Sequence, residues 1–374
     1  MVTAMPLLSL SGSYQEMGHE YGRQMAALID RNLQDYRRRF REVAGLSDGE
    51  VRSWGARYRA VARAYDPDLE TMLVALAEGA GQEPEQIFAL NARTELLYGA
   101  AARGRAPADD CTSLAVLPSH TVDGHVLLGQ NWDWHPEQRE LTFLLLTRDE
   151  EGFAVLTLTE AGMLAKSGLN SAGLGVCANL LVSSEDRGGD GVPYHLLLRG
   201  VLQSRTMADA LRAVTAHPRI SSGNLLIADA GGEAIDLEVC PSDFGYVLPE
   251  DGLIAHSNHF LSGLPVRDLR KGVSALTLLR PARARHLLQP RLDARTVTTD
   301  DLKAVFRDHY SYPNGICRHV DERDPELERV CSVYSIVMDL TAGSFEIAQH
   351  PPCAHDYEAI RLPQGSGVAA GAGS

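Results

Sequence analysis

The chain has 374 residues, of which 44% are hydrophobic and 22% charged, and its formal net charge is −14. These proportions are ordinary for a folded globular protein, and the length predicts either two or three domain-sized units or one large layered domain with an appendage. The negative charge argues against nucleic acid or an anionic membrane as a partner. The sequence contains no run of about 18 apolar residues, so no membrane-spanning helix is predicted.

The first part of the chain, residues 1–110, has a helical pattern. Helices are predicted over Tyr14–Val43, Glu50–Ala80 and Pro84–Tyr98, the last of which begins with proline and acidic residues, as helix N-termini do. The chain starts without the basic and apolar regions of a secretory signal. Its six cysteines are scattered and form no CxxC pair, so we expect free thiols and a cytoplasmic location.

Cys111 stands at the junction between this helical part and a strand-rich remainder. It follows a tract rich in Gly, Ala and Pro over residues 99–110 and opens a strand-like run. Cleavage of the Asp110–Cys111 peptide bond would leave Cys111 with an α-amino group beside its own thiol. Such an amine has a pKa of roughly 7.7–8, so it can accept the thiol proton near neutral pH. Cys111 is therefore a candidate nucleophile, and a buried core cysteine is the alternative.

Beyond Cys111 the pattern predicts strands that alternate with pairs of helices. The predicted strands are Leu114–Leu117, His125–Gly129, Leu141–Thr147, Phe153–Thr159, Gly175–Leu181, Asn224–Asp229, Ala234–Val239, Ser332–Leu340 and Ser344–Gln349. Hairpin turns are expected at residues 121–124, 230–233 and 341–343. The predicted helices are Tyr194–Gln203, Met207–Ala216, Val273–Leu288 and Asp300–His309. This order predicts an α+β fold in which two antiparallel sheets pack face to face with helices outside, followed by a disordered tail from about residue 365 to residue 374.

Several short segments carry a resemblance to a known family. They are Asp110-Cys111-Thr112-Ser113, Gly129–Trp134, Asn170–Gly175, Ser257–Phe260 and Pro313–Arg318, with two N-terminal stretches at residues 12–18 and 90–95. Through them the chain resembles the isopenicillin-N acyltransferase family of autoproteolytic N-terminal-nucleophile hydrolases, peptidase family C45. The resemblance implies a four-layer αββα sandwich for residues 111–374, a helical pro-segment for residues 1–110, and self-cleavage between Asp110 and Cys111.

Four polar residues are candidates for roles around Cys111. The carboxylate of Asp133 could hold the new amino group by a charge-assisted hydrogen bond, and the amide of Asn258 could stabilise the oxyanion. The resemblance places an active-site arginine at Arg318, which would orient Asp133 or lower the pKa of the thiol. Asn179 is a candidate for a second hydrogen-bond donor to the oxyanion or for a contact with the substrate. The alternatives are a turn-capping Asp133, an Asn258 that satisfies loop backbone and a solvated Arg318.

Aromatic residues near these motifs are candidate substrate contacts, although large aromatic side chains fill cores more often than they bind ligands. Trp132, Trp134 and Phe260 are the main candidates, with Tyr194 and Tyr312 beside them.

Two other kinds of chemistry are weaker alternatives. A papain-like pair of Cys111 with His125, His135 or His256 is the main rival. However, Cys111 opens a strand rather than a helix, which favours the amine as the base. The pair His256 and His259 has no cysteine or carboxylate at a recognisable ligand spacing, so we expect no metal. No cofactor is expected, with acyl-CoA as the one co-substrate considered.

The predicted function is a self-processing cysteine amidohydrolase or acyltransferase that cleaves a small-molecule amide through an acyl-thioester on Cys111. The acyl group would pass to water or to a second amine, and the two fragments of the chain would stay associated. An acyl-CoA-dependent N-acyltransferase of the penicillin type is one alternative. An unprocessed, non-catalytic binding protein is the other, supported by Asp110, because the family usually has glycine there. Gly315 also stands where some members carry serine.

Overall fold

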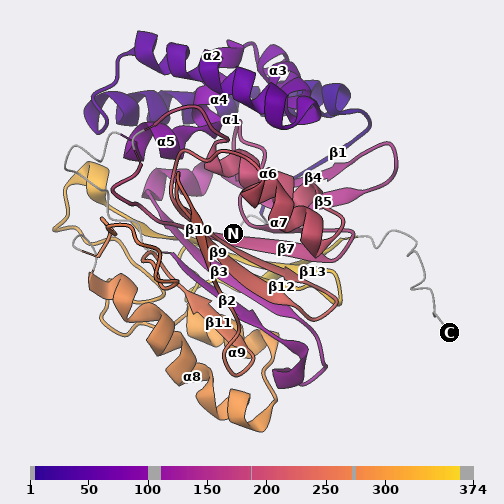
Figure 1. The fold of residues 1–374 in the computed structure, drawn as a ribbon, viewed down its shortest axis with the longest axis vertical. Coiled ribbons are helices and arrows are strands. Elements are labelled where there is room, and N and C mark those ends of the chain that lie inside the picture. Colours follow the sequence, from indigo (N-terminus) through magenta and orange to yellow (C-terminus); the bar gives the residue numbers. More distant parts are fainter. Residues whose placement is uncertain (1–4, 100–110, 187, 272–274, 363–374) are drawn as a thin grey trace.

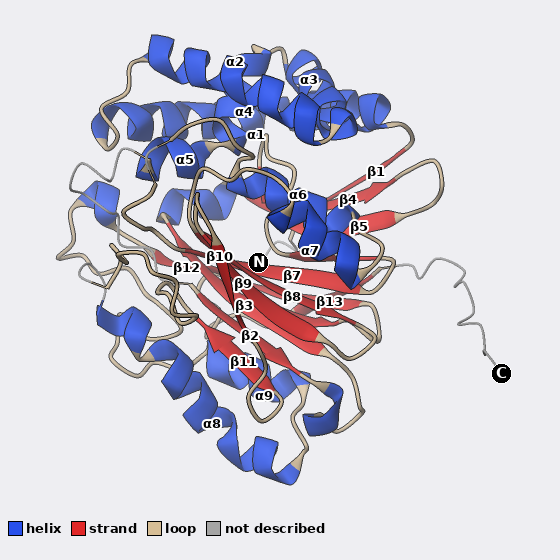
Figure 2. Ribbon diagram, viewed as in Figure 1, coloured by secondary structure: helices blue, strands red, loops and turns tan. Residues whose placement is uncertain are grey.

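Two β-sheets lie against each other between two layers of helices. The computed structural model describes residues 5–99, 111–186, 188–271 and 275–362. In Figure 1 the N-terminal helices, in indigo and purple, lie at one end of the molecule and the orange helices α8 and α9 at the other, with the strands between them. Figure 2 shows the same division into helical and strand layers. The predicted α+β sandwich of four layers is therefore confirmed.

The N-terminal part is a group of helices: α1 (Tyr14–Glu42), α2 (Asp48–Tyr65), α3 (Pro67–Ala80), α4 (Pro84–Asn91) and α5 (Arg93–Tyr98). The single helix predicted over residues 50–80 is wrong, because the chain breaks between α2 and α3. The Asp66 side chain caps α3, and Pro67 follows in its first turn, where its missing N–H costs nothing. The last predicted helix likewise divides, at Ala92.

Helix α1 packs closely on α3 because small residues face the contact. A Cβ atom added to Gly18 would lie 2.2 Å from the Met72 carbonyl oxygen, and one added to Gly22 would lie 2.1 Å from that of Leu76. At its start, α1 has a capping box in which Ser13 and Glu16 satisfy each other's backbone N–H groups. Its inner face then reaches the strand layer, where the ring of Tyr21 meets that of Phe143 edge to face.

The larger sheet has eight strands. In spatial order they are β1 (Leu7–Ser11), β4 (Thr142–Arg148), β5 (Ala154–Glu160), β6 (Gly168–Asn170), β7 (Leu174–Leu180), β8 (Gly223–Asp229), β9 (Ala234–Val239) and β10 (Phe244–Val247). All neighbours are antiparallel except β1, which runs parallel to β4. The strand β1 was not predicted, so the N-terminal part is not purely helical. It adds an edge strand to a sheet built from the rest of the chain.

The smaller sheet has six strands, and Cys111 comes directly before one of its inner strands. In spatial order they are β11 (Leu253–His256), β2 (Thr112–Val116), β3 (Leu127–Trp134), β12 (Cys331–Asp339), β13 (Ser344–Gln349) and β14 (Glu358–Arg361). The hairpins predicted at residues 121–124, 230–233 and 341–343 are confirmed. Strands β2 and β3 are buried at every position, because the larger sheet covers one face and helices cover the other.

Four helices form the remaining outer cover. α6 (Tyr194–Gln203) and α7 (Met207–Thr215) pack on the larger sheet, and α8 (Arg280–Ala294) and α9 (Thr299–Phe306) pack on the smaller one. The helix predicted from Val273 begins later, at Arg280, with Pro281 in its first turn and a short 3-10 turn over Ala275–Leu278 before it. The start of that prediction lies outside the described residues, as does the predicted tail.

One hydrophobic core joins the two parts of the chain. The same buried cluster contains Tyr21 and Leu76 from the N-terminal helices and Val155 and Leu226 from the larger sheet. This shared core supports the expectation that the parts stay together after any cut at residue 110. Among the helices of the described residues, none combines the length and the apolar character needed to cross a membrane.

Candidate active site

Cys111 sits immediately before β2, and its backbone is held on both sides by one loop. Its N–H donates to the Oδ1 atom of Asn258, and its carbonyl oxygen accepts a hydrogen bond of 2.7 Å from the Ser257 hydroxyl. Both residues follow β11, which pairs antiparallel with β2 and places His256 opposite Ser113. The side chain of Cys111 is 2% exposed. The sheet register therefore fixes the position of the thiol.

The orientation of the Asn258 amide follows from its two partners. The Cys111 N–H is a donor, so the atom that faces it is the amide oxygen. The amide nitrogen donates to the Leu180 carbonyl oxygen at 2.8 Å. Its backbone N–H is also taken, by the Thr277 hydroxyl at 2.7 Å. In this arrangement Asn258 accepts from the nucleophile's nitrogen, and its predicted role as an oxyanion donor stays a prediction.

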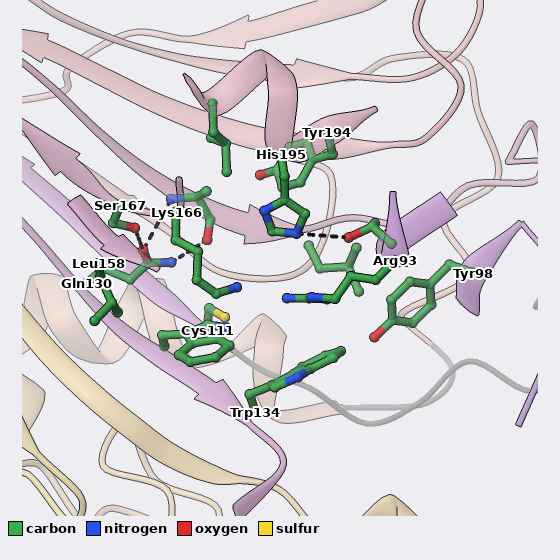
Figure 3. Close-up of a pocket in the computed structure, with 15 residues that line it drawn as sticks. Arg93, Tyr98, Cys111, Gln130, Trp134, Leu158, Lys166, Ser167, Tyr194 and His195 are labelled. Carbon is green, nitrogen blue, oxygen red and sulfur yellow. Dashed lines mark hydrogen bonds between the residues drawn. The ribbon is translucent and has the colours of Figure 1, made fainter. Parts of the chain in front are cut away.

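The thiol faces a small cavity of about 40 Å³ between the sheets and the N-terminal helices. Side chains alternate along a strand, so Gln130, Trp132 and Trp134 of β3 all face this cavity. The remaining lining residues are Arg93, Thr94, Tyr98, Leu158, Lys166, Ser167, Ala178, Leu180, Tyr194, His195 and Leu198. Figure 3 shows Lys166 reaching toward the Cys111 sulfur, with Arg93 beside it and Trp134 below.

A cluster of buried charges forms one wall of the cavity. The Glu160 carboxylate accepts from the Arg93 guanidinium at 2.8 and 3.1 Å, and it lies 2.9 Å from the Lys166 ammonium. The Tyr36 hydroxyl donates to its other oxygen at 2.5 Å. Each cation also lies over an aromatic ring: Lys166 is 3.9 Å from the Trp132 ring centroid. This wall joins the N-terminal helices to the end of β5 in the larger sheet.

The cluster changes the protonation of its members. Burial alone would raise the pKa of Glu160, but Arg93 and Lys166 hold it well below its ordinary value. Burial lowers the pKa of Lys166 to about 8, against the opposing effect of Glu160, so most of this lysine is charged at pH 7. The charge on the Cys111 thiolate also acts on Lys166. A cation beside a cysteine favours the reactive thiolate form.

Asp133 lies on the opposite face of β3 from the cavity residues. Its carboxylate accepts from the Arg280 guanidinium at 2.7 Å and from the Ser332 hydroxyl at 2.6 Å, under helix α8. Its backbone carbonyl, in contrast, accepts from the Cys111 thiol at 3.9 Å. Burial raises the pKa of Asp133 to about 6, although Arg280 and Arg318 oppose this. Its predicted hold on the Cys111 amine stays a prediction.

Two further predicted residues are buried close by. Arg318 lies near Asp133, since its charge lowers the pKa of that carboxyl and its backbone N–H donates to the Ser332 hydroxyl at 2.8 Å. Asn179 on β7 joins the two sheets: its amide nitrogen donates to the Ser113 hydroxyl at 2.7 Å, and its oxygen accepts from Gln130 at 3.0 Å. Asn179 therefore lies behind the cavity wall.

The aromatic candidates divide between the cavity and other places. Trp132, Trp134 and Tyr194 line the cavity. Phe260 is buried but is not among the lining residues, and its backbone N–H donates to Asp268 at 3.0 Å. Tyr312 is 66% exposed and packs against His319.

The histidines proposed for a papain-like pair have other partners. His125 bonds to Asp339 at 2.8 Å, and His135 bonds to the Arg329 carbonyl oxygen at 3.2 Å. Both ring nitrogens of His256 face acceptors, Glu238 and the carbonyl oxygen of Ser257, each at 2.7 Å. None of the three lines the cavity, so the geometry favours the amine as base.

Sequence reasoning assigned no role to several residues of the site, although some of them lie in the motifs quoted above. They are Arg93, Glu160, Lys166, Gln130, His195, Arg280 and Ser257. The rarity of lysine was the one signal available for Lys166, one of three lysines in the chain. Asp110, which is predicted to precede the cleaved bond, lies outside the described residues.

Solved structures of two enzymes show some likeness to the chain. One is a Caenorhabditis elegans N-acylethanolamine-hydrolyzing acid amidase (NAAA) ortholog, with 14% identity and a TM-score of 0.47 over 68% of this chain and 100% of that one. The other is penicillin V acylase from Agrobacterium tumefaciens, with 12% identity and a TM-score of 0.48 over 67% of this chain and 86% of that one.

Sequence comparison gives the family directly. A curated protein of Emericella nidulans, described as acyl-coenzyme A:6-aminopenicillanic-acid-acyltransferase 40 kDa form, is 30% identical over 272 residues, which are 71% of each chain. The profile of the family described as acyl-coenzyme A:6-aminopenicillanic acid acyl-transferase matches residues 120–346, more than half of the chain. The resemblance predicted from short motifs is confirmed, and the chain belongs to this acyl-transferase family.

Proposed function

We propose that this chain is a self-processing cysteine amidohydrolase or acyltransferase whose nucleophile is Cys111. The observation that carries the proposal is the setting of this residue. Asn258 and Ser257 hold its backbone nitrogen and oxygen, while its thiol faces a cavity beside a buried lysine. A thiol placed this way has a fixed direction of attack and a nearby cation that favours its reactive form.

Processing would begin with attack of the Cys111 sulfur on the Asp110 carbonyl carbon. A C–S bond forms, the Asp110–Cys111 C–N bond breaks, and the nitrogen of Cys111 leaves as a free amine. Water then hydrolyses the thioester and restores the thiol. The Asn258 oxygen, which accepts from the backbone N–H of Cys111, is placed to accept from the new amine as well.

Turnover would repeat this chemistry on an external amide. The amine takes the thiol proton, and the thiolate attacks the substrate carbonyl to give a tetrahedral oxyanion. Collapse breaks the C–N bond, and the ammonium gives its proton to the leaving nitrogen. Water or a second amine then attacks the thioester, a new C–O or C–N bond forms, and the thiolate leaves.

The cavity supports a small acyl group as the part of the substrate that it holds. Its floor is aromatic, with Trp132 and Trp134, and its cationic wall carries Arg93 and Lys166. A volume of about 40 Å³ leaves room for few atoms beside the thiol. We therefore propose small-molecule amides with short or flat acyl groups as substrates, and a cytoplasmic location stays part of this proposal.

The test is a screen of N-acyl amides and amino-acid amides with mass detection of the acyl group on Cys111. Wild-type protein should gain the acyl mass on the peptide that carries Cys111, and Cys111→Ala should gain none and turn over no amide. A matched control is Cys240→Ala, which removes another buried thiol and should keep the adduct and the activity. Turnover by Cys111→Ala would contradict the proposal. A wild type without adduct or turnover would favour the non-catalytic alternative.

Acyl transfer from acyl-CoA is a second candidate, because the Emericella nidulans relative is described as an acyl-coenzyme A:6-aminopenicillanic-acid-acyltransferase. Incubation with an acyl-CoA and 6-aminopenicillanic acid distinguishes the two. Formation of the N-acyl product faster than free acid would favour the transferase, and release of free acid alone would favour the hydrolase.

A further inference from the structure

Four metal-binding side chains meet at a place that the proposed chemistry does not use. They are His309, Cys317, His319 and Cys353, and their ligand atoms all lie within 4.8 Å of one another. None of them lines the Cys111 cavity. Cys317 is buried, His319 and Cys353 are half-buried, and His309 is exposed. The cluster therefore has a buried side and a side open to solvent.

Three of the six distances between the ligand atoms are close to those of a tetrahedral site, and the other three are at most 4.8 Å. The Nε2 atoms of His309 and His319 are 3.1 Å apart, and the His319 Nε2 atom lies 3.7 Å from the Cys317 sulfur and 3.5 Å from the Cys353 sulfur. In a tetrahedral zinc site with Zn–N of about 2.0–2.1 Å and Zn–S of about 2.3 Å, the ligand atoms stand roughly 3.3 Å (N to N) and 3.6 Å (N to S) apart. The observed distances are close to these values.

We propose that His309, Cys317, His319 and Cys353 form a structural zinc site. Two thiolates and two imidazoles are a ligand set that suits Zn²⁺, whereas Mg²⁺ and Ca²⁺ prefer oxygen ligands. Four protein ligands fill a tetrahedral site, which is typical of structural rather than catalytic zinc. This proposal departs from the expectation of no metal, which rested on spacing within single segments.

Existing hydrogen bonds already hold the two ligand-bearing segments in place. The segment after α9 folds on itself, because the Cys317 N–H donates to the Asp308 carbonyl at 3.0 Å and the His319 N–H to that of Pro313 at 2.8 Å. The guanidinium of Arg307 reaches the second segment and donates to the carbonyls of residues 352 and 355 at 3.0 and 2.7 Å. The site is therefore largely formed by the fold itself.

The zinc site would brace the far side of the active site. The segment that carries Cys317 also carries Gly315 and Arg318. The carbonyl oxygen of Gly315 accepts a hydrogen bond of 2.6 Å from Arg280. The same arginine bonds to Asp133. Loss of the metal should therefore loosen the segment that supports Asp133, while the Cys111 cavity on the other face is affected less.

Metal content measured on the full-length protein tests the proposal independently of any activity. Protein purified from zinc-supplemented cells should contain one zinc per chain by mass spectrometry. Replacement by Co²⁺ should give thiolate-to-cobalt charge transfer and the intense visible bands of tetrahedral cobalt. Cys353→Ser and His309→Asn should each lower zinc affinity by more than about 100-fold. Mutation of a residue that only hydrogen-bonds to a metal ligand already lowers metal affinity roughly 10–100-fold. His286→Asn, which changes an exposed histidine of α8, is the matched control and should keep the metal.

His309 is exposed, so its variant should fold and keep the test informative if Cys353→Ser does not. Purified wild type without stoichiometric zinc and without a tetrahedral cobalt spectrum would overturn the proposal. A disulfide between Cys317 and Cys353 in protein isolated without exposure to oxidants would overturn it too. Metal content that is equal in the His309 and His286 variants would also contradict it.

Discussion

Two buried carboxyl groups lie on opposite sides of the nucleophile and differ in how their charge is balanced. Glu160 stands on the cavity side, between Arg93 and Lys166. Asp133 stands under α8, bonded to Arg280 and Ser332. Each is fully buried and each has cations around it. Yet the pKa of Glu160 is well below its ordinary value, while that of Asp133 is raised to about 6.

The contacts explain the difference. Glu160 receives two hydrogen bonds from Arg93, a close ammonium from Lys166 and a hydroxyl from Tyr36, which together outweigh its burial. The carboxylate of Asp133 accepts hydrogen bonds from Arg280 and Ser332 and has the charge of Arg318 nearby, but its burial outweighs these effects. Glu160 is thus a permanent anion that holds the cavity wall together. Of these two carboxyl groups, Asp133 is the one whose pKa of about 6 lets it change protonation near neutral pH.

The largest effect on stability is expected for Glu160→Gln, because it leaves Arg93 and Lys166 buried without their anion. Removal of one partner of a buried ion pair costs roughly 3–5 kcal/mol, which urea unfolding at pH 7 measures. The folded pKa of Glu160 is lowered, so its contribution is present above its ordinary value and is lost as pH falls through the folded pKa. The exposed control Glu140→Gln should stay within about 0.5 kcal/mol. Equal stability of the two variants would contradict the account.

Asp133→Asn should show the opposite dependence on pH. The folded pKa is raised, so protonation of Asp133 stabilises the fold fully below about 3.8, and this stability is lost as pH rises through about 6. Relative to the variant, wild type should therefore lose up to roughly 3 kcal/mol of unfolding free energy between pH 4 and pH 7, since a pKa unit is worth about 1.4 kcal/mol. Parallel stability curves for the two proteins would rule out a titrating Asp133.

Lys166→Met tests whether the cavity cation activates the thiol. The rate of alkylation of Cys111 against pH should shift upward by roughly 1–3 pH units, because an opposite charge close to a titrating group shifts its pKa by that amount. Lys271→Met, at an exposed lysine, should leave the profile unchanged. An unshifted profile in Lys166→Met would show that this lysine only balances Glu160.

The smallest effect is expected for Ser257→Ala, which removes the hydroxyl bonded to the Cys111 carbonyl oxygen. A hydrogen bond contributes a net of about 0.5–1.5 kcal/mol, so stability should fall modestly and amide turnover several-fold. Ser119→Ala, at an exposed position, provides the comparison. If Ser257→Ala has the same stability and amide turnover as Ser119→Ala, the Ser257 hydroxyl does not help to position Cys111.

Local signals predicted most of the fold. The hairpin at Asp123-Gly124 and the first residue of α1, Tyr14, depend only on neighbours in sequence, and both were predicted. The strand β1 was missed because its pairing partner, β4, lies far along the chain and runs parallel to it. The break at Pro67 was visible in the sequence, but the helical pattern on both sides hid it.

The site was predictable only in part, for the same reason. Cys111 stands at a junction that sequence composition marks, and short motifs beside it identify the family. The wall of Arg93, Glu160 and Lys166 comes from α5 and from the end of β5 with the turn after it, two segments that only the fold brings together. The direction of the Asp133 carboxylate follows from alternation along β3, once its register with β2 is known.

The central claim is that Cys111 becomes the first residue of its own fragment and uses its amine as base. N-terminal sequencing and intact mass of protein that turns over an amide test this directly. The account predicts two fragments that copurify, the second of which begins at Cys111 with a free amino group. Full amide turnover by protein in which the nitrogen of residue 111 is still bonded to residue 110 would contradict it.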